Sequence, residues 1–255
     1  MSSSVLFEIR DDVAYVTLSR PEARNAMNRE LLASLSQAVE RLRSEVCVSF
    51  LVIQGAGGHF SGGADLRELS GSSPEQVREI AQLAVHTFNA LEQLPVVSIA
   101  AIEGYAVGGG MELAEACSLR VCAEDSRLGH PEVLVGAVAG FGGTTRLMRS
   151  VGRSRATELL LTGRLQSAGE ALDLGIVARV VPTGTALSAA EAMIAELRRA
   201  PRYALRYTLS AIQAAADASI DAGTRAGAAY FGLAATEPEF REAVERFFSR
   251  RGAKA

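Results

Sequence analysis

Short runs of alternating or continuous apolar residues are separated by longer stretches with apolar residues at helical spacing in the first half of the chain. Residues 5–10 and 13–19 predict a hairpin that turns at Asp11 and Asp12. Apolar runs that end in glycine predict buried strands at 48–57 and 96–104, and a further strand is predicted at 119–124. Amphipathic stretches predict helices at 30–44 and 73–94, and the second begins with Ser-Pro, a helix-start signal. This alternation predicts an α/β layered core.

From about Val151 the pattern becomes mostly helical, with a short strand expected at 177–182. The expected helices in this part are 154–163, 167–175, 185–200, 201–217 and 237–251. We therefore expect an α/β core over residues 1–195 and a helical region over 196–255. Because so short a region buries little apolar surface alone, it should pack on the core or on another subunit.

Composition narrows the function classes. The 255 residues are 48% hydrophobic and 22% charged, with a net charge of −3, which indicates a globular protein and gives no support for nucleic-acid binding. The 3 cysteines are scattered, without metal-ligand spacing, so neither a disulfide framework nor a metal site is expected. No signal peptide pattern and no apolar run long enough for a membrane span are visible, so the expected location is cytoplasmic.

Two glycine-rich loops, residues 57–69 and 103–113, follow predicted buried strands. Ligands in α/β sheets bind at the carboxyl ends of strands, and helix N-termini there favour negative charge. The loops either serve tight packing or form an oxyanion hole, in which each donates one N–H to the same oxygen. The spacing alone leaves both interpretations open. A dinucleotide site is disfavoured, because "GGGMEL" does not give G-x-G-x-x-G.

Two glutamates stand in apolar surroundings. Glu112 lies in the first turn after the glycines, and Glu132 follows Pro131. Two carboxyl groups with separable protonation states suit acid–base chemistry on one water, and burial raises a glutamate pKa toward neutrality. The alternative is that each complements a helix N-terminus, which residue types alone favour.

Four segments together carry a family resemblance. Residues 20–28, 60–69, 100–122 and 128–152 strongly resemble the crotonase superfamily, the enoyl-CoA hydratase/isomerase family. The similarity runs in order from about Val5 to Arg251. It implies a crotonase-like ββα spiral core that holds an acyl-CoA site, and a helical C-terminal region that assembles homotrimers or homohexamers.

The resemblance also assigns roles to residues. Backbone N–H groups of Ala64 and Gly109 match the oxyanion hole, and Glu112 and Glu132 match both glutamates of the hydratases. The positions that match the coenzyme A site are Arg24, Ala26, Gly62, Ala64, Asp65 and Leu66. A guanidinium at Arg24 suits phosphate oxygens on physical grounds too.

Because both glutamates are present, the resemblance implies an enoyl-CoA hydratase that needs no cofactor beyond the thioester substrate and no metal. One carboxylate takes a proton as water attacks the β-carbon, and the other carboxyl group delivers a proton to the α-carbon. The alternatives are an isomerase, hydrolase or other lyase that acts on an acyl group linked to coenzyme A or to an acyl carrier protein. A non-catalytic or RNA-binding member is disfavoured by the negative net charge.

His130, Phe141 and Leu69 are candidates for the acyl pocket, and packing in the core is the alternative for Phe141 and Leu69. Ala139 stands where the family usually has proline, and Phe141 is bulky for its position. His130 precedes Pro131 and Glu132. It either acts on the glutamate or the substrate, or is a loop histidine with its hydrogen bonds satisfied.

Overall fold

The predicted N-terminal hairpin forms in the computed structural model, which describes residues 4–216 and 218–252. Strand β1 (Val5–Arg10) pairs antiparallel with β2 (Val13–Leu18). Asp11 at the turn has a φ of 54°, a left-handed conformation that aspartate tolerates better than most residues.

The sheet continues from this hairpin with parallel strands in the order β1-β2-β3-β4-β6-β9. The added strands are β3 (Phe50–Gly55), β4 (Val97–Ile102), β6 (Leu119–Ala123) and β9 (Arg179–Val181). Every residue of β4 is buried, which explains why its sequence is a continuous apolar run rather than an alternating one. The predicted strands are confirmed, each within a few residues of its expected ends.

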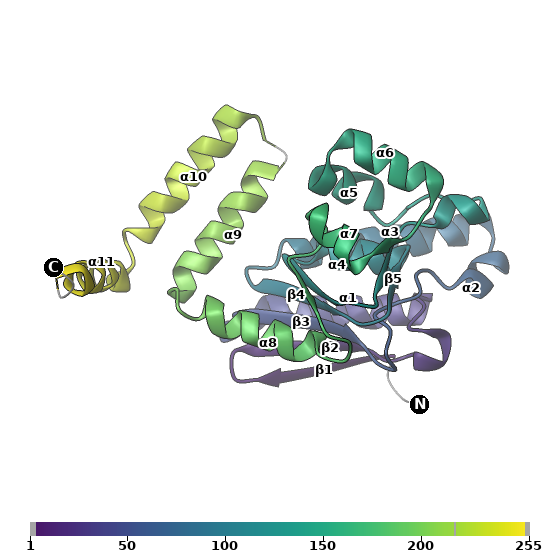
Figure 1. The fold of residues 1–255 in the computed structure, drawn as a ribbon, viewed down its shortest axis with the longest axis horizontal. Coiled ribbons are helices and arrows are strands. Elements are labelled where there is room, and N and C mark those ends of the chain that lie inside the picture. The colour runs from purple at the N-terminus through teal and green to yellow at the C-terminus, as the bar shows by residue number, and fades with distance from the viewer. Residues whose placement is uncertain (1–3, 217, 253–255) are drawn as a thin grey trace. The chain divides into compact units, whose positions relative to one another are not determined.

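Two long helices pack together beside the sheet (Figure 1). Helix α1 (Arg29–Ser44) begins where Asn28 accepts a hydrogen bond from the Leu31 N–H. Helix α3 (Pro74–Glu92) begins at Ser73, which forms a capping box with Gln76. Both helices were predicted, and the Ser-Pro start signal of α3 is confirmed.

A second sheet and several short helices complete the first unit. The sheet has the order β5-β7-β8, formed by β5 (Tyr105–Val107), β7 (Arg127–Gly129) and β8 (Gln166–Ser167). The helices are η1 (Pro21–Ala23), α2 (Leu66–Ser70), α4 (Gly109–Ala116), η2 (Glu132–Val135), α5 (Gly143–Val151), α6 (Arg153–Thr162) and α7 (Ala168–Asp173). Neither the second sheet nor α5 was predicted from the sequence.

The chain divides into two compact units, Met1–Met193 and Ile194–Ala255, and α8 (Ala186–Leu197) crosses this boundary. The second unit holds α9 (Arg202–Ala216), α10 (Ile220–Ala234) and α11 (Pro238–Gly252). Helices α9 and α10 pack against each other. Within the described residues, no helix is both long enough and apolar enough to cross a membrane.

Candidate active site

The two glycine-rich loops lie side by side in the first unit. The segment that ends at Ala64 runs parallel to β5, where the Ser61 N–H donates to the Tyr105 carbonyl at 2.9 Å. On its other side the Met27 N–H donates to the Gly63 carbonyl at 2.7 Å. Ala64 is therefore held between the segment that precedes α1 and the strand that leads into α4.

This arrangement brings the backbone of Ala64 next to that of Gly109. A Cβ on Gly109 would lie 3.4 Å from the Ala64 nitrogen, and a Cβ on Gly63 would lie 3.5 Å from the Gly109 nitrogen. Gly63 and Gly108 have φ values of 95° and 52°, which other residues adopt only with strain. Within the described residues, neither the Ala64 N–H nor the Gly109 N–H donates a backbone hydrogen bond. Two adjacent donors at a helix N-terminus are the components that an oxyanion hole needs.

Glu112 lies in the first turn of α4 and is 1% exposed. Its Oε1 accepts hydrogen bonds from the N–H groups of Phe141 at 2.7 Å and Gly143 at 2.8 Å. Burial is the main influence that raises the pKa of Glu112 to about 7, with help from the charge of Glu132. The Gly143 and Phe141 N–H groups and the charge of His130 oppose this rise in pKa. The carboxyl group can therefore hold or release a proton near neutral pH.

Glu132 lies at the start of η2, against the glycine that precedes the α4 helix. A Cβ on Gly108 would be 3.2 Å from the Glu132 Oε1. The Glu132 side chain is 16% exposed, and within the described residues neither of its carboxylate oxygens has a hydrogen-bond partner. Glu132 thus stands beside the same turn that carries Gly109 and Glu112, with both oxygens buried and without a hydrogen-bond partner among the described residues.

His130 lies close to Glu132 and is buried together with Glu115 of α4. The His130 Nε2 is 3.0 Å from the Glu115 Oε1, and the two side chains are 1% and 2% exposed. The His130 Nδ1 is 3.9 Å from the Glu132 Oε1, a distance for a charge interaction rather than a hydrogen bond. A side chain so enclosed offers little surface to an acyl group, which differs from the expectation that His130 lines the pocket.

The expected coenzyme A segment is built from two chain stretches. Arg24 has a φ of 51°, and its carbonyl accepts a hydrogen bond from the Gly62 N–H at 2.7 Å. Its guanidinium lies over the Tyr105 ring, 5.6 Å from the ring centroid. Arg24 and Gly62 are therefore adjacent, at the entrance to the two loops.

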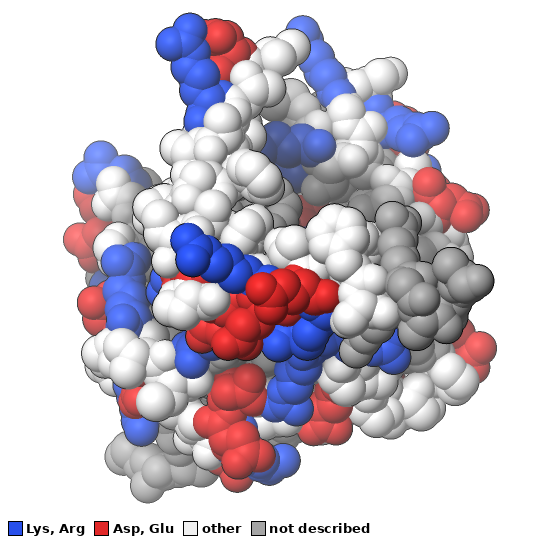
Figure 2. Space-filling view, turned by 90° about the vertical axis from the view of Figure 1, so that its left-hand side faces the viewer, with Lys and Arg blue, Asp and Glu red and all other residues white. Residues whose placement is uncertain are grey.

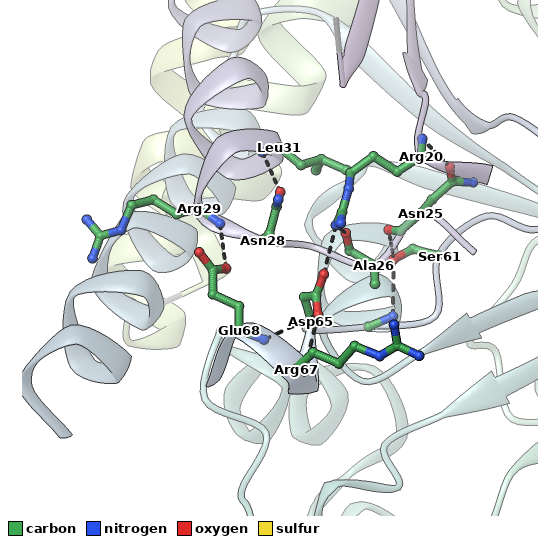
Figure 3. Close-up of polar contacts among 11 residues, drawn as sticks. Arg20, Asn25, Ala26, Asn28, Arg29, Leu31, Ser61, Asp65, Arg67 and Glu68 are labelled. Atoms are coloured by element: carbon green, nitrogen blue, oxygen red, sulfur yellow. Dashed lines mark hydrogen bonds and ion pairs between the residues drawn. The ribbon is translucent and has the colours of Figure 1, made fainter. Parts of the chain in front are cut away.

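Asp65 connects these stretches through side-chain contacts (Figure 3). Its carboxylate caps α2 by accepting from the N–H groups of Arg67 and Glu68, and it forms an ion pair with Arg20 at 3.0 Å. The same guanidinium of Arg20 donates to the carbonyl of Ala26. Asp65 and Ala26 are thus occupied with holding the loop in shape, whereas Leu66, the first residue of α2, is more than half exposed.

The two apolar residues expected in the pocket lie in different surroundings. The Phe141 ring is buried and edge-on to Phe88, with ring centroids 6.2 Å apart. A Cβ on Gly109 would lie 3.0 Å from that ring, so Phe141 packs directly on the first residue of α4. Leu69 of α2 is partly buried and packs against the core cluster.

Known proteins resemble this chain over most of its length. The family model for enoyl-CoA hydratase/isomerase matches residues 8–254. The chain belongs to this family. It is 38% identical over 202 residues to an enoyl-CoA isomerase/hydratase of Mycosarcoma maydis, which covers 76% of this chain and 74% of the relative. It is 37% identical over 179 residues to a crotonyl-CoA hydratase of Syntrophomonas wolfei, with 70% and 69% covered. A solved enoyl-CoA hydratase from Bacillus anthracis superposes with a TM-score of 0.92 at 31% identity, over 97% of this chain and 96% of that one.

Membership of the enoyl-CoA hydratase/isomerase family confirms the predicted family and the crotonase-like fold. Sequence reasoning missed three parts of the site. Glu115, three residues after Glu112 in an apolar helix, was a visible signal that was not used. The N–H groups of Phe141 and Gly143 that hold Glu112 leave no signal in residue type, because every non-proline residue carries such a donor.

Proposed function

We propose that the protein is an enoyl-CoA hydratase, which adds water in the syn sense across the α,β double bond of an enoyl thioester. The observation that carries this proposal is the placement of Glu112 and Glu132 around the first turn of α4, beside the N–H groups of Ala64 and Gly109. An acid–base pair next to an oxyanion hole is the equipment that this addition requires.

In the proposed reaction, the two N–H groups stabilise charge and the two glutamates transfer protons. The Ala64 and Gly109 N–H groups stabilise the negative charge that develops on the thioester oxygen as water attacks the β-carbon. One glutamate accepts a proton from that water, and the other donates a proton to the α-carbon. A pKa of about 7 suits Glu112 to either role near neutral pH. Its Oε1 is fixed by two N–H groups, which leaves the Oε2 to face the reacting atoms.

The coenzyme A thioester is proposed to enter over Arg24, Ala26, Gly62 and the segment from Ala64 to Leu66. The exposed guanidinium of Arg24 supports this direction, because it suits phosphate oxygens. The printed names of the relatives from Syntrophomonas wolfei and Bacillus anthracis support a hydratase that acts on a coenzyme A thioester. No cofactor besides the thioester enters the proposed reaction.

The direct test is hydration of crotonyl-CoA, followed by loss of the enoyl thioester absorbance and by product identification. Glu112→Gln and Glu132→Gln keep the shape of each side chain and should each lower kcat by about 10²–10⁴-fold. The matched control is Glu40→Gln, an exposed glutamate on α1 that should retain full activity. A wild-type enzyme that binds coenzyme A but leaves every enoyl thioester unchanged would refute the proposal.

Isomerisation of the double bond is a second candidate, supported by the printed name of the relative from Mycosarcoma maydis. An isomerase moves a proton between carbons and adds no water, so one carboxyl group suffices. Activity that survives Glu112→Ala and is lost in Glu132→Ala would favour isomerisation. Equal loss in both variants would favour hydration.

An RNA-binding role is disfavoured by the surface charge. On the face that Figure 2 shows, Arg side chains are intermixed with Asp and Glu side chains and form no basic field. Binding dominated by phosphate contacts requires such a field and weakens steeply with salt. A salt-dependent affinity for RNA in a filter-binding assay would revive this alternative.

The helical region over 196–255 is proposed to assemble homotrimers or homohexamers. Helices α9, α10 and α11 enclose an open apolar groove of about 800 Å³, lined by residues that include Tyr203, Tyr230 and Phe231. Phe231 and Phe248 are more than half exposed, which supports a surface that is covered in an assembly. Light scattering that shows only monomers at micromolar concentration would contradict this assembly.

A further inference from the structure

A single imidazole stands among three carboxyl groups beneath the proposed site. His130 contacts Glu115 at 3.0 Å through Nε2 and approaches Glu132 to 3.9 Å through Nδ1. Glu112 also lies close to the ring, since a Cβ on Gly143 would be 2.7 Å from the His130 Cε1 and 3.0 Å from the Glu112 Cγ. Burying several carboxylates together is unfavourable unless a positive charge compensates them.

The charged groups around His130 come from several elements. Glu112 and Glu115 belong to α4, and Glu132 belongs to η2. Arg120 of β6 interacts with the charge of Glu115, while its own guanidinium donates to the backbone carbonyls of residues 114, 117 and 176. The Arg120 guanidinium is therefore engaged with backbone carbonyls. His130 is the group placed to supply positive charge toward Glu132.

The balance of these influences favours the charged imidazole. Burial is the largest influence and alone would lower the pKa of His130. The charge and hydrogen bond of Glu115, with a contribution from Glu132, overcome it and raise the pKa to about 10. In the imidazolium form both ring nitrogens are donors, so Nε2–H donates to Glu115 and Nδ1–H faces Glu132.

We propose that His130 is a positioning residue: paired with Glu115 as the imidazolium, it orients the Glu132 carboxylate and places a positive charge beside the two glutamates of the site. This inference rests on the proposed hydratase function, which gives those two glutamates their roles. It assigns a task to Glu115, which the proposed reaction does not use directly. Glu115 acts on the site through His130.

The competing explanation is a buried ion pair that only stabilises the fold. The two explanations separate in the variant that replaces both partners with neutral amides, Glu115→Gln with His130→Gln. Two amides can still hydrogen-bond to each other, so a structural role would be largely restored. The positive charge beside Glu132 would still be missing, so a charge role would not be restored.

The first measurement reads the charge directly, by NMR of protein with labelled histidine rings. The chain has 3 histidines, and His86→Gln and His130→Gln identify the signals by elimination. The wild-type His130 signal should stay in the imidazolium form from pH 5 to pH 9. In Glu115→Gln, the loss of the nearest counter-charge should lower its titration by about two pH units or more. A wild-type His130 that is neutral, or that titrates near its ordinary value, would overturn the proposal.

The second measurement is the pH profile of kcat/KM for crotonyl-CoA hydration. In the double variant, kcat should fall about ten- to a hundredfold, because a loosened carboxylate misplaces the reacting atoms. Removal of the imidazolium should raise the pKa of the nearby carboxyl groups, so the low-pH limb of the profile should shift to higher pH by about one unit. The exposed variant His86→Gln should keep the wild-type profile. A double variant that has both wild-type kcat and the wild-type limb would reduce His130 to a structural role.

The two proposals fail in different ways. If no enoyl thioester is hydrated by the wild-type protein, the proposed function fails, whereas the NMR titration still judges His130 without turnover. An imidazolium that persists to pH 9 in the wild type and titrates at lower pH in Glu115→Gln would support the pairing of His130 with Glu115. A His130 titration that Glu115→Gln leaves unchanged would refute this pairing, even if the wild-type protein is an active hydratase.

Discussion

Gly63→Ala is the substitution that should test the proposed oxyanion hole most sharply. Gly63 has a φ of 95°, and an added Cβ would lie 2.8 Å from the Val107 carbonyl oxygen. Contacts between carbon and a carbonyl oxygen are ordinarily about 3.3 Å or longer, so the two strands must separate by roughly 0.5 Å. The Val107 N–H donates to the Ser61 carbonyl at 3.1 Å, so this displacement acts on the segment that carries Ala64.

The expected magnitude combines two effects. Alanine in a left-handed conformation destabilises the fold by about 1–2 kcal/mol. Displacing one of two preorganised donors lowers kcat by about 10²–10³-fold, because such donors act only when positioned for the developing charge. We therefore expect Gly63→Ala to lose most of its activity while it stays folded.

Gly58→Ala is the matched control, because it separates backbone strain from displacement. Gly58 has a φ of 78° in the same loop, and a Cβ there meets no atom within 4 Å. It should lose comparable conformational stability and keep its activity. The assays are urea unfolding and crotonyl-CoA hydration for both variants. A folded Gly63→Ala enzyme with kcat within threefold of wild type would refute the placement of the oxyanion hole.

Three further substitutions test the surrounding loop. Burial alone would raise the pKa of Asp65, but hydrogen bonds from Arg20 and from the first turn of α2 hold that pKa below its ordinary value. The ionised Asp65 therefore stabilises the fold above its unfolded pKa, and this stabilisation is lost as the pH falls through its folded pKa. Asp65→Asn should therefore lower the free energy of unfolding by about 1 kcal/mol at pH 7 and by little at pH 3, as measured with urea. Phe141→Ala should destabilise the fold by about 3 kcal/mol or more and raise kcat/KM for bulky enoyl thioesters relative to crotonyl-CoA. Arg24→Ala should raise KM for a coenzyme A thioester and leave KM for the corresponding pantetheine thioester unchanged, because only the former carries the nucleotide phosphates.

The fold was predictable where residue patterns extend over more than one turn or strand repeat. The buried strands β3 and β4 and the helices α1 and α3 each gave a clear signal. Strands β5, β7 and β8 have only two or three residues, too few to establish a period of two. Helix α5 begins at Gly143 after Gly142, and these glycines obscured its start because glycine disfavours helix interiors.

The site was predictable to the extent that it depends on local sequence. The two glycine-rich loops were visible because they follow predicted buried strands, whereas the choice of Ala64 and Gly109 within them rested on the family resemblance. The pairing of His130 with Glu115 spans 15 positions and two elements, so no local periodicity indicates it. The charge and hydrogen bond of Glu115 decide the state of His130, because they overcome the burial that alone would lower the pKa of the imidazole. Such contacts become visible only when the fold has brought the elements together.

Helix α4 explains how a glycine run and buried carboxylates tolerate one another. Gly109 opens the helix, and Glu112 and Glu115 follow at intervals of three residues, so the three lie along one side of it. Glycine weakens a helix by about 1 kcal/mol per residue, but here a Cβ at Gly109 or Gly110 would collide with Phe141 or Ser61. The close packing that excludes side chains at these glycines also excludes water, and this desolvation raises the pKa of Glu112. The feature that costs helix stability is thus the one that prepares the carboxyl group for the proposed proton transfer.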